Sequence, residues 1–189
     1  VVVRVPTSSV DLIAAAYDRG QMGLGMMGGQ STISPEAIVL SVVPDAQAPA
    51  SEVAAAASTP LPDLRGRTPD ARRTVTLSMD GGMGMRFLID GRSFNPDRID
   101  QSVTIGTVEE WAIVNQSPMN HPFHLHIWPM QVVHAGGSDV SGVEIRDVVD
   151  IPARQSITVR ISFDRFPGTT VYHCHILDHE DLGMMGILQ

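Results

Sequence analysis

The only cysteine of the sequence lies between two histidines, in His173-Cys174-His175. Successive side chains of a strand point to opposite faces, so Cys174 would point to one face and both histidines to the other. His179 follows the cysteine by five residues, and Met184 comes directly after Gly183. A thiolate, two imidazoles and a weak axial methionine form the ligand set of a blue-copper electron-transfer site. This segment therefore predicts a copper centre at Cys174 and leaves two histidines for a second metal centre.

A second histidine cluster, residues 121–126 (HPFHLH), can supply the imidazole that the first cluster lacks. His121 precedes a proline, which favours an extended or turn conformation for it. His124 and His126 are two residues apart and share one face of a strand. We therefore expect His121 to complete the blue-copper site and the other two histidines to join the second centre.

Together the two motifs resemble the C-terminal part of a bacterial multicopper oxidase of the laccase and cuprous-oxidase type. The matching segments are residues 120–126 (NHPFHLH), residues 172–179 (YHCHILDH) and residues 183–185 (GMM). They have the order and the spacing of that family. The resemblance implies an enzyme that oxidises phenols, aromatic amines or metal ions such as Cu(I) by one electron at a time. It also implies that four such electrons reduce dioxygen to water.

The resemblance assigns a role to each metal-binding side chain. His121, Cys174, His179 and Met184 would hold the type 1 copper, His124 the type 2 copper, and His126, His173 and His175 the type 3 pair. Glu180 matches a family position that relays protons to the oxygen-reducing cluster. Without the resemblance, Glu180 could equally be an exposed carboxylate on a helical turn.

The histidine count predicts a partner. Enzymes of this family need eight histidines for the oxygen-reducing cluster, and four of them come from the N-terminal domain. This chain supplies four, and its remaining histidine, His134, is expected to pack or cap near a strand end. We therefore expect the N-terminal part of the same oxidase to bring the other four, either within one longer chain or as a separate chain.

The strand-like runs that would hold these residues are short and are separated by turn-forming residues. This pattern predicts an all-β, cupredoxin-like Greek-key sandwich. Residues 74–189 would form a C-terminal cupredoxin domain with the type 1 site, residues 45–73 an Ala/Pro-rich linker, and residues 1–44 the closing strands of a middle cupredoxin domain. A short helix in the linker's alanine run is the alternative. The expected strands are 1–5, 37–43, 74–79, 86–90, 103–105, 108–115, 124–134, 156–163, 169–176 and 185–188, and the expected core residues are Trp111, Ile113, Phe123, Val159, Ile161 and Phe163.

Composition limits the cellular setting and the partners. The formal net charge is -8 and the sequence pI is about 5.2, which argues against a nucleic-acid partner. No run approaches the length of a transmembrane helix, so we expect no membrane span. The resemblance implies a periplasmic or secreted enzyme.

Methionine-rich segments raise the question of the substrate. Met22, Met26 and Met27 form one group, and Met79, Met83 and Met85 form another. Thioethers suit Cu(I), so these groups could collect cuprous copper, but they could equally be adaptable packing residues.

Met119 matches a substrate-copper position beside the type 1 centre of cuprous oxidases. The aspartate that shares this task in the family is Ser117 here. The substitution favours an oxidase of broad specificity.

A stand-alone blue-copper electron-transfer protein without oxygen chemistry is the alternative function. Such a protein has no need of the four histidines assigned to the second centre, and burying unused imidazoles is costly. A copper nitrite reductase fits less well, because it does not account for the His-Cys-His triplet.

Overall fold

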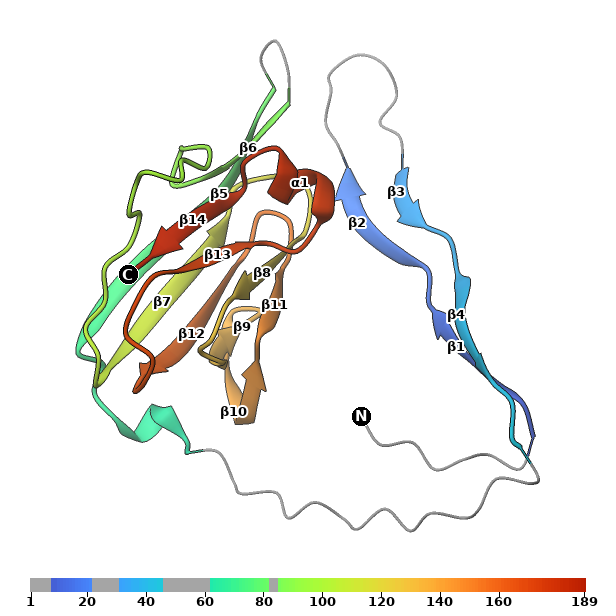
Figure 1. The fold of residues 1–189 in the computed structure, drawn as a ribbon, viewed down its shortest axis with the longest axis horizontal. Coiled ribbons are helices and arrows are strands. Elements are labelled where there is room, and N and C mark those ends of the chain that lie inside the picture. Colours follow the sequence, from blue (N-terminus) through green and yellow to red (C-terminus); the bar gives the residue numbers. More distant parts are fainter. Residues whose placement is uncertain (1–7, 22–30, 46–61, 82–84) are drawn as a thin grey trace.

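The protein is described by a computed structural model that covers residues 8–21, 31–45, 62–81 and 85–189 (Figure 1). Residues 71–189 form two sheets, with strand orders β10-β9-β12-β7-β5-β6 and β11-β8-β13-β14. Most neighbouring strands are antiparallel, whereas β5 and β7 pair in parallel. The elements are β5 (Ala71–Asp80), β6 (Arg86–Ile89), β7 (Thr107–Asn115), β8 (His121–Leu125), β9 (Met130–Ala135), β10 (Ser138–Arg146), β11 (Val148–Ile151), β12 (Ser156–Phe163), β13 (Thr170–Cys174), α1 (Leu177–Asp181) and β14 (Met185–Leu188).

The two sheets enclose one apolar core. Strand β12 shows the cause, because its buried and exposed residues alternate along the strand, as a half-buried strand requires. Trp111 of β7 and Tyr172 of β13 meet edge to face across the core, with ring centroids 6.1 Å apart. The predicted all-β cupredoxin-like fold is confirmed, and so is the predicted core, since all six of its residues are completely buried.

Several predicted strand bounds differ from the structure. The run 124–134 is broken between β8 and β9, where Ile127 has a positive φ of 75° and the Trp128 amide donates to the His126 carbonyl (2.9 Å). Residues 103–105 are not a strand, although the Val103 amide donates to the Gln189 carbonyl. Strands β10 and β11 were not predicted. β5 begins at Ala71 rather than Thr74.

The stretch predicted as a linker also contains ordered residues beside the sandwich. A short 3₁₀ helix spans Leu64–Gly66, and the Leu64 side chain is buried. The Leu64 amide donates to the Gln131 side chain (2.7 Å), which ties this segment to β9. Residues 46–61, which include the alanine run, lie outside the described residues.

The N-terminal residues form two narrow antiparallel ribbons, β1 (Val10–Ala14) with β4 (Ala37–Val42), and β2 (Tyr17–Gln21) with β3 (Ser31–Ser34). Strand β4 corresponds to the predicted run 37–43, whereas the predicted strand 1–5 lies outside the described residues. β2 reaches the sandwich at an antiparallel bridge between Gly20 and Met119. A Cβ atom at Gly20, whose φ is 90°, would lie 2.5 Å from the Pro118 carbonyl oxygen, so only glycine fits this contact.

Candidate copper centres

The first cluster joins three elements at one buried point. Cys174 ends β13, His121 begins β8, and His179 lies in α1. The Cys174 Sγ atom is 3.6 Å from the Nδ1 atom of each histidine, and the two Nδ1 atoms are 3.1 Å apart. One sulfur and two imidazole nitrogens therefore converge as a trigonal His₂Cys copper site requires.

The chain after Cys174 returns to this cluster in a compact path. Helix α1 brings His179 back toward the sulfur, and Gly183, with a φ of 105°, then turns the chain into β14. The Met184 amide donates to the His179 carbonyl (2.9 Å), and the Cys174 amide donates to the Met184 carbonyl (3.0 Å). These bonds hold Met184, which is completely buried, beside the ligands that sequence reasoning grouped with it.

Two neighbouring side chains, whose contacts with the imidazoles were not predicted from the sequence, orient these rings. The Ser117 hydroxyl lies 2.7 Å from His121 Nε2, which leaves Nδ1 to face the sulfur. The Phe87 ring stacks on His179 with centroids 3.8 Å apart. An isolated phenylalanine in a strand carries no signal for such a contact. Ser117 could be noticed only as the residue that replaces the family's aspartate.

Burial sets the protonation of the first cluster. It lowers the pKa of His121 to about 3, with a smaller contribution from His179, and it lowers the pKa of His179 to about 4, with help from Arg19. Burial also raises the pKa of the Cys174 thiol to about 12. The imidazoles are therefore neutral and ready to bind a metal, whereas the thiolate needs a cation to stabilise it.

The second cluster lies on the other side of β13. His126 Nε2 is 3.1 Å from His173 Nε2, and the His124 ring lies 4.7 Å from the His126 ring and 5.3 Å from the His173 ring. The His124 Nδ1 atom is 2.8 Å from the Asp147 carbonyl oxygen, which leaves its Nε2 for a metal. Burial lowers the pKa of His126, and the neighbouring histidines add to the effect. One ring nitrogen from each of these three histidines can be chosen so that all three nitrogens lie within 4.8 Å of one another.

The remaining second-cluster residues surround this group. The His175 ring is 5.5 Å from the His124 ring and 5.9 Å from the His173 ring, and its side chain is exposed. Glu180 Oε2 is 3.2 Å from His173 Nδ1, and the same nitrogen lies 2.9 Å from the Cys174 carbonyl oxygen. Because His124 and His126 are only half-buried, the cluster is open on one side, where further ligands could approach.

The other candidate residues occupy separate places. Met119 is buried beside the first cluster, and its carbonyl accepts hydrogen bonds from the Asn115 side-chain amide (2.6 Å) and the Ser117 hydroxyl (3.0 Å). His134 pairs with Asp139 (3.0 Å) and belongs to neither cluster. Met79 and Met85 pack against the core, whereas Met22, Met26, Met27 and Met83 lie outside the described residues.

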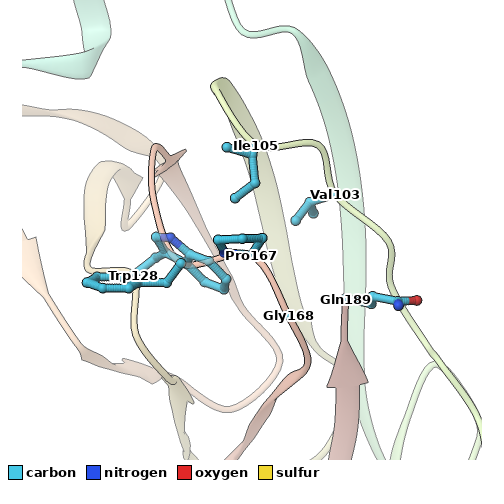
Figure 2. Close-up of a pocket in the computed structure, with 7 residues that line it drawn as sticks. Val103, Ile105, Trp128, Pro167, Gly168 and Gln189 are labelled. Carbon is cyan, nitrogen blue, oxygen red and sulfur yellow. The ribbon is translucent and has the colours of Figure 1, made fainter.

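A pocket of about 280 Å³ lies apart from both clusters (Figure 2). Its wall includes Trp128, Phe166 and Pro167. None of the side chains that line it is a typical metal ligand or a typical general acid or base. Among the residues that the structure describes, the two histidine clusters are the groups whose ligand atoms lie close enough together to hold a metal ion.

Comparison with known proteins supports this interpretation of the residues. A sequence family described as multicopper oxidase matches residues 67–189. A multicopper oxidase of Staphylococcus aureus is 35% identical over 63% of this chain and 27% of its own length, and a laccase of Bacillus stratosphericus is 31% identical over 67% of this chain and 29% of its own. The chain thus spans less than a third of these relatives.

Solved structures of multicopper oxidases and laccases also resemble this chain. A multicopper oxidase from Campylobacter jejuni, described as a metallo-oxidase, superimposes with a TM-score of 0.63 over 96% of this chain and 40% of its own, at 26% identity. A laccase from Pediococcus acidilactici superimposes with a TM-score of 0.58 over 70% of this chain and 29% of its own, at 29% identity.

Proposed function

Because this chain belongs to the multicopper oxidase family, we propose that it takes single electrons from a reductant at its first cluster and delivers them to an oxygen-reducing centre built on its second. One observation carries the proposal. Adjacent residues of β13 serve the two clusters, since Cys174 Sγ faces His121 and His179 while His173 Nε2 faces His126. Electrons can therefore pass between the clusters along one short covalent path.

The proposed ligands follow this geometry. His121, Cys174, His179 and Met184 hold the type 1 copper, His124 the type 2 copper, and His126, His173 and His175 contribute to the type 3 pair. When bound, these coppers supply one-electron oxidation at the first cluster and four-electron reduction of dioxygen to water at the second. Glu180 lies beside the second cluster, with Oε2 3.2 Å from His173 Nδ1, and this position supports the proton-relay role that the family resemblance gives it.

The proposed enzyme also needs the N-terminal part of the oxidase. The second cluster has four histidines from this chain and is open on one side, which suits four more from a partner domain. In this arrangement residues 1–44 belong to a middle cupredoxin domain, 45–73 to a linker whose last three residues already begin β5, and 74–189 to the C-terminal domain. The alternative, a blue-copper electron carrier, leaves the convergence of His124, His126 and His173 without a purpose.

We further propose a broad range of reductants, namely phenols, aromatic amines and metal ions such as Cu(I). Relatives described as a laccase and as a metallo-oxidase support this range. Ser117 has a hydroxyl group, which hydrogen-bonds to His121, where the cuprous oxidases have an aspartate. The carboxylate that would favour a tightly held metal substrate is therefore missing at this position. No helix of the described residues is long and apolar enough to span a membrane, and a periplasmic or secreted location is proposed from the family alone.

Copper loading tests the proposal. The chain should bind about one copper with an intense blue absorption, and about four when the N-terminal part is present. Cys174→Ser should abolish the blue colour, whereas Met184→Leu should retain it and raise the reduction potential, because loss of a weak axial donor favours Cu(I). Copper binding without a blue band in the unmodified chain would refute the type 1 assignment, and turnover by Cys174→Ser would refute the electron path.

A further inference from the structure

Tyr17 forms a hydrogen-bonded triad outside both copper clusters. Its hydroxyl donates to the Asp150 carboxylate and accepts from the Asn120 side-chain amide (2.8 Å). The same amide nitrogen is 3.3 Å from Asp150 Oδ2. Side chains from β2, from the residue before β8 and from β11 thus meet at the phenol oxygen, while 47% of the Tyr17 surface remains exposed.

Asn120 connects this triad to the first cluster. It directly precedes His121 in the chain, and its backbone amide donates to the Arg19 carbonyl (2.8 Å). Its side-chain oxygen accepts from the Ala153 amide (2.9 Å), so both ends of the residue are fixed. The Tyr17 oxygen is therefore one hydrogen bond from a residue that is peptide-bonded to a type 1 ligand.

The first cluster offers no ligand on the described surface. His121, Cys174 and Met184 are completely buried, and His179 is 3% exposed. Met119, the residue predicted on the substrate side, is only 2% exposed. A bulky reductant cannot touch any of these side chains, so its electrons must cross intervening protein.

We propose that Tyr17 is a proton-coupled electron relay between bulky reductants and the type 1 copper, with Asp150 as the proton acceptor. The inference rests on the proposed function, since it requires an oxidising copper at His121 and Cys174. With Cu(II) bound at the first cluster, Tyr17 would give it one electron, so that the ion would become Cu(I), and the hydroxyl proton of Tyr17 would move to Asp150 Oδ2. The reductant then gives one electron to the Tyr17 phenoxyl radical, and the proton returns from Asp150. The reductant has lost one electron, and both side chains are restored.

The surroundings of the phenol favour this coupled step. Burial and the hydrogen bond to Asp150 raise the pKa of Tyr17, so the hydroxyl is protonated at neutral pH. Loss of an electron alone would leave a positive charge in a partly desolvated place, which is costly unless the proton leaves too. The phenol proton already lies in the hydrogen bond to Asp150 Oδ2, and Asp150 Oδ1 is buried with no hydrogen-bond partner among the described residues, so the carboxylate is not saturated with donors.

The test compares one reductant in two sizes. The copper-loaded chain, free of oxygen, is mixed with 2,6-dimethoxyphenol either free or coupled to dextran, and bleaching of the blue absorption is followed. Tyr17→Phe keeps the ring but removes the hydroxyl. The rate of bleaching by the dextran-bound phenol should therefore fall at least about tenfold, while the rate of bleaching by the free phenol should fall less than about twofold. Bleaching of the unmodified chain by the bound phenol should also slow in D₂O, and Tyr17→Phe should lose that isotope effect.

Two further variants separate the relay from a structural role. Asp150→Asn can still accept the phenol hydrogen bond but cannot take up its proton, so it should be slowed like Tyr17→Phe. Phe166→Leu removes another exposed aromatic ring, beside the Trp128 pocket, and should bleach at the original rate. An intact blue band with unchanged bleaching by the bound phenol in Tyr17→Phe would overturn the relay alone. Absence of a blue band in the unmodified chain would overturn the proposed function, and the relay with it.

Discussion

Metal binding at the first cluster should release one proton from Cys174. With the thiol pKa at about 12, only about one molecule in 10⁵ carries the thiolate at pH 7. His121 and His179, with pKa values of about 3 and about 4, have no proton to lose at that pH. Forming the thiolate costs about 7 kcal/mol at pH 7, which the metal–sulfur bond must offset. The apparent affinity should therefore rise about tenfold per pH unit between pH 5 and 9.

Cobalt(II) is a suitable probe, because it does not oxidise the thiol. It is titrated into the metal-free chain in weakly buffered solution with an indicator dye, while the thiolate-to-cobalt absorption reports binding. Cys174→Ser is the matched control, since protons released at the second cluster persist in it. The difference should be about one proton per cobalt at pH 6, 7 and 8. Equal release by both proteins would show that the thiol is not a ligand, and a difference of about two would contradict the neutral histidines.

Three other outcomes follow from the buried contacts. In the metal-free folded chain, the pKa values of His121 and His179 lie below the ordinary value of 6.5. The unfolded state therefore binds more protons, and the free energy of unfolding falls as the pH drops below 6.5. Urea unfolding should show a loss of about 1.4 kcal/mol per pH unit for each histidine. Phe87→Ala should cost about 3–5 kcal/mol in the same assay, because this ring is buried against His179, and Phe87→Leu should cost clearly less. Gly20→Ala should release β2 from Pro118 and expose residues 17–21 to faster amide hydrogen exchange, whereas Gly142→Ala, which has open space, should leave that exchange unchanged.

The arrangement of the site residues within one strand could be predicted from the alternation of side chains along that strand. Alternation along residues 173–175 separates Cys174 from His173, and the structure places them on opposite sides of β13. Contacts between distant segments carry no such signal. The stacking of Phe87 on His179 and the docking of Gly20 on Pro118 depend on how β6 and β2 reach the cluster, which periodicity does not determine.

The strand errors have comparable physical causes. The run 124–134 reads as one apolar strand, but Ile127 adopts a left-handed conformation and Pro129 provides no amide for a ladder. Strand β10 is polar and largely exposed on its edge of the sheet, so its sequence lacks the alternation that identifies a half-buried strand. The core part of β12 was predictable because its apolar residues recur at every second position, and Trp111 and Ile113 of β7 follow the same alternation.

The return path of the chain after Cys174 also affects how the protein resists proteolysis. His121 belongs to β8, whereas Cys174, His179 and Met184 span the segment that ends in β14. A metal held by these residues would clasp the last strand to the middle of the sequence. Without it, α1 and β14 are held by backbone hydrogen bonds and by the packing of side chains such as His179, Ile187 and Leu188, so we expect them to open more readily as a unit and to offer a cleavage site. A metal ion bound at the first cluster would then decide whether the C-terminal segment survives.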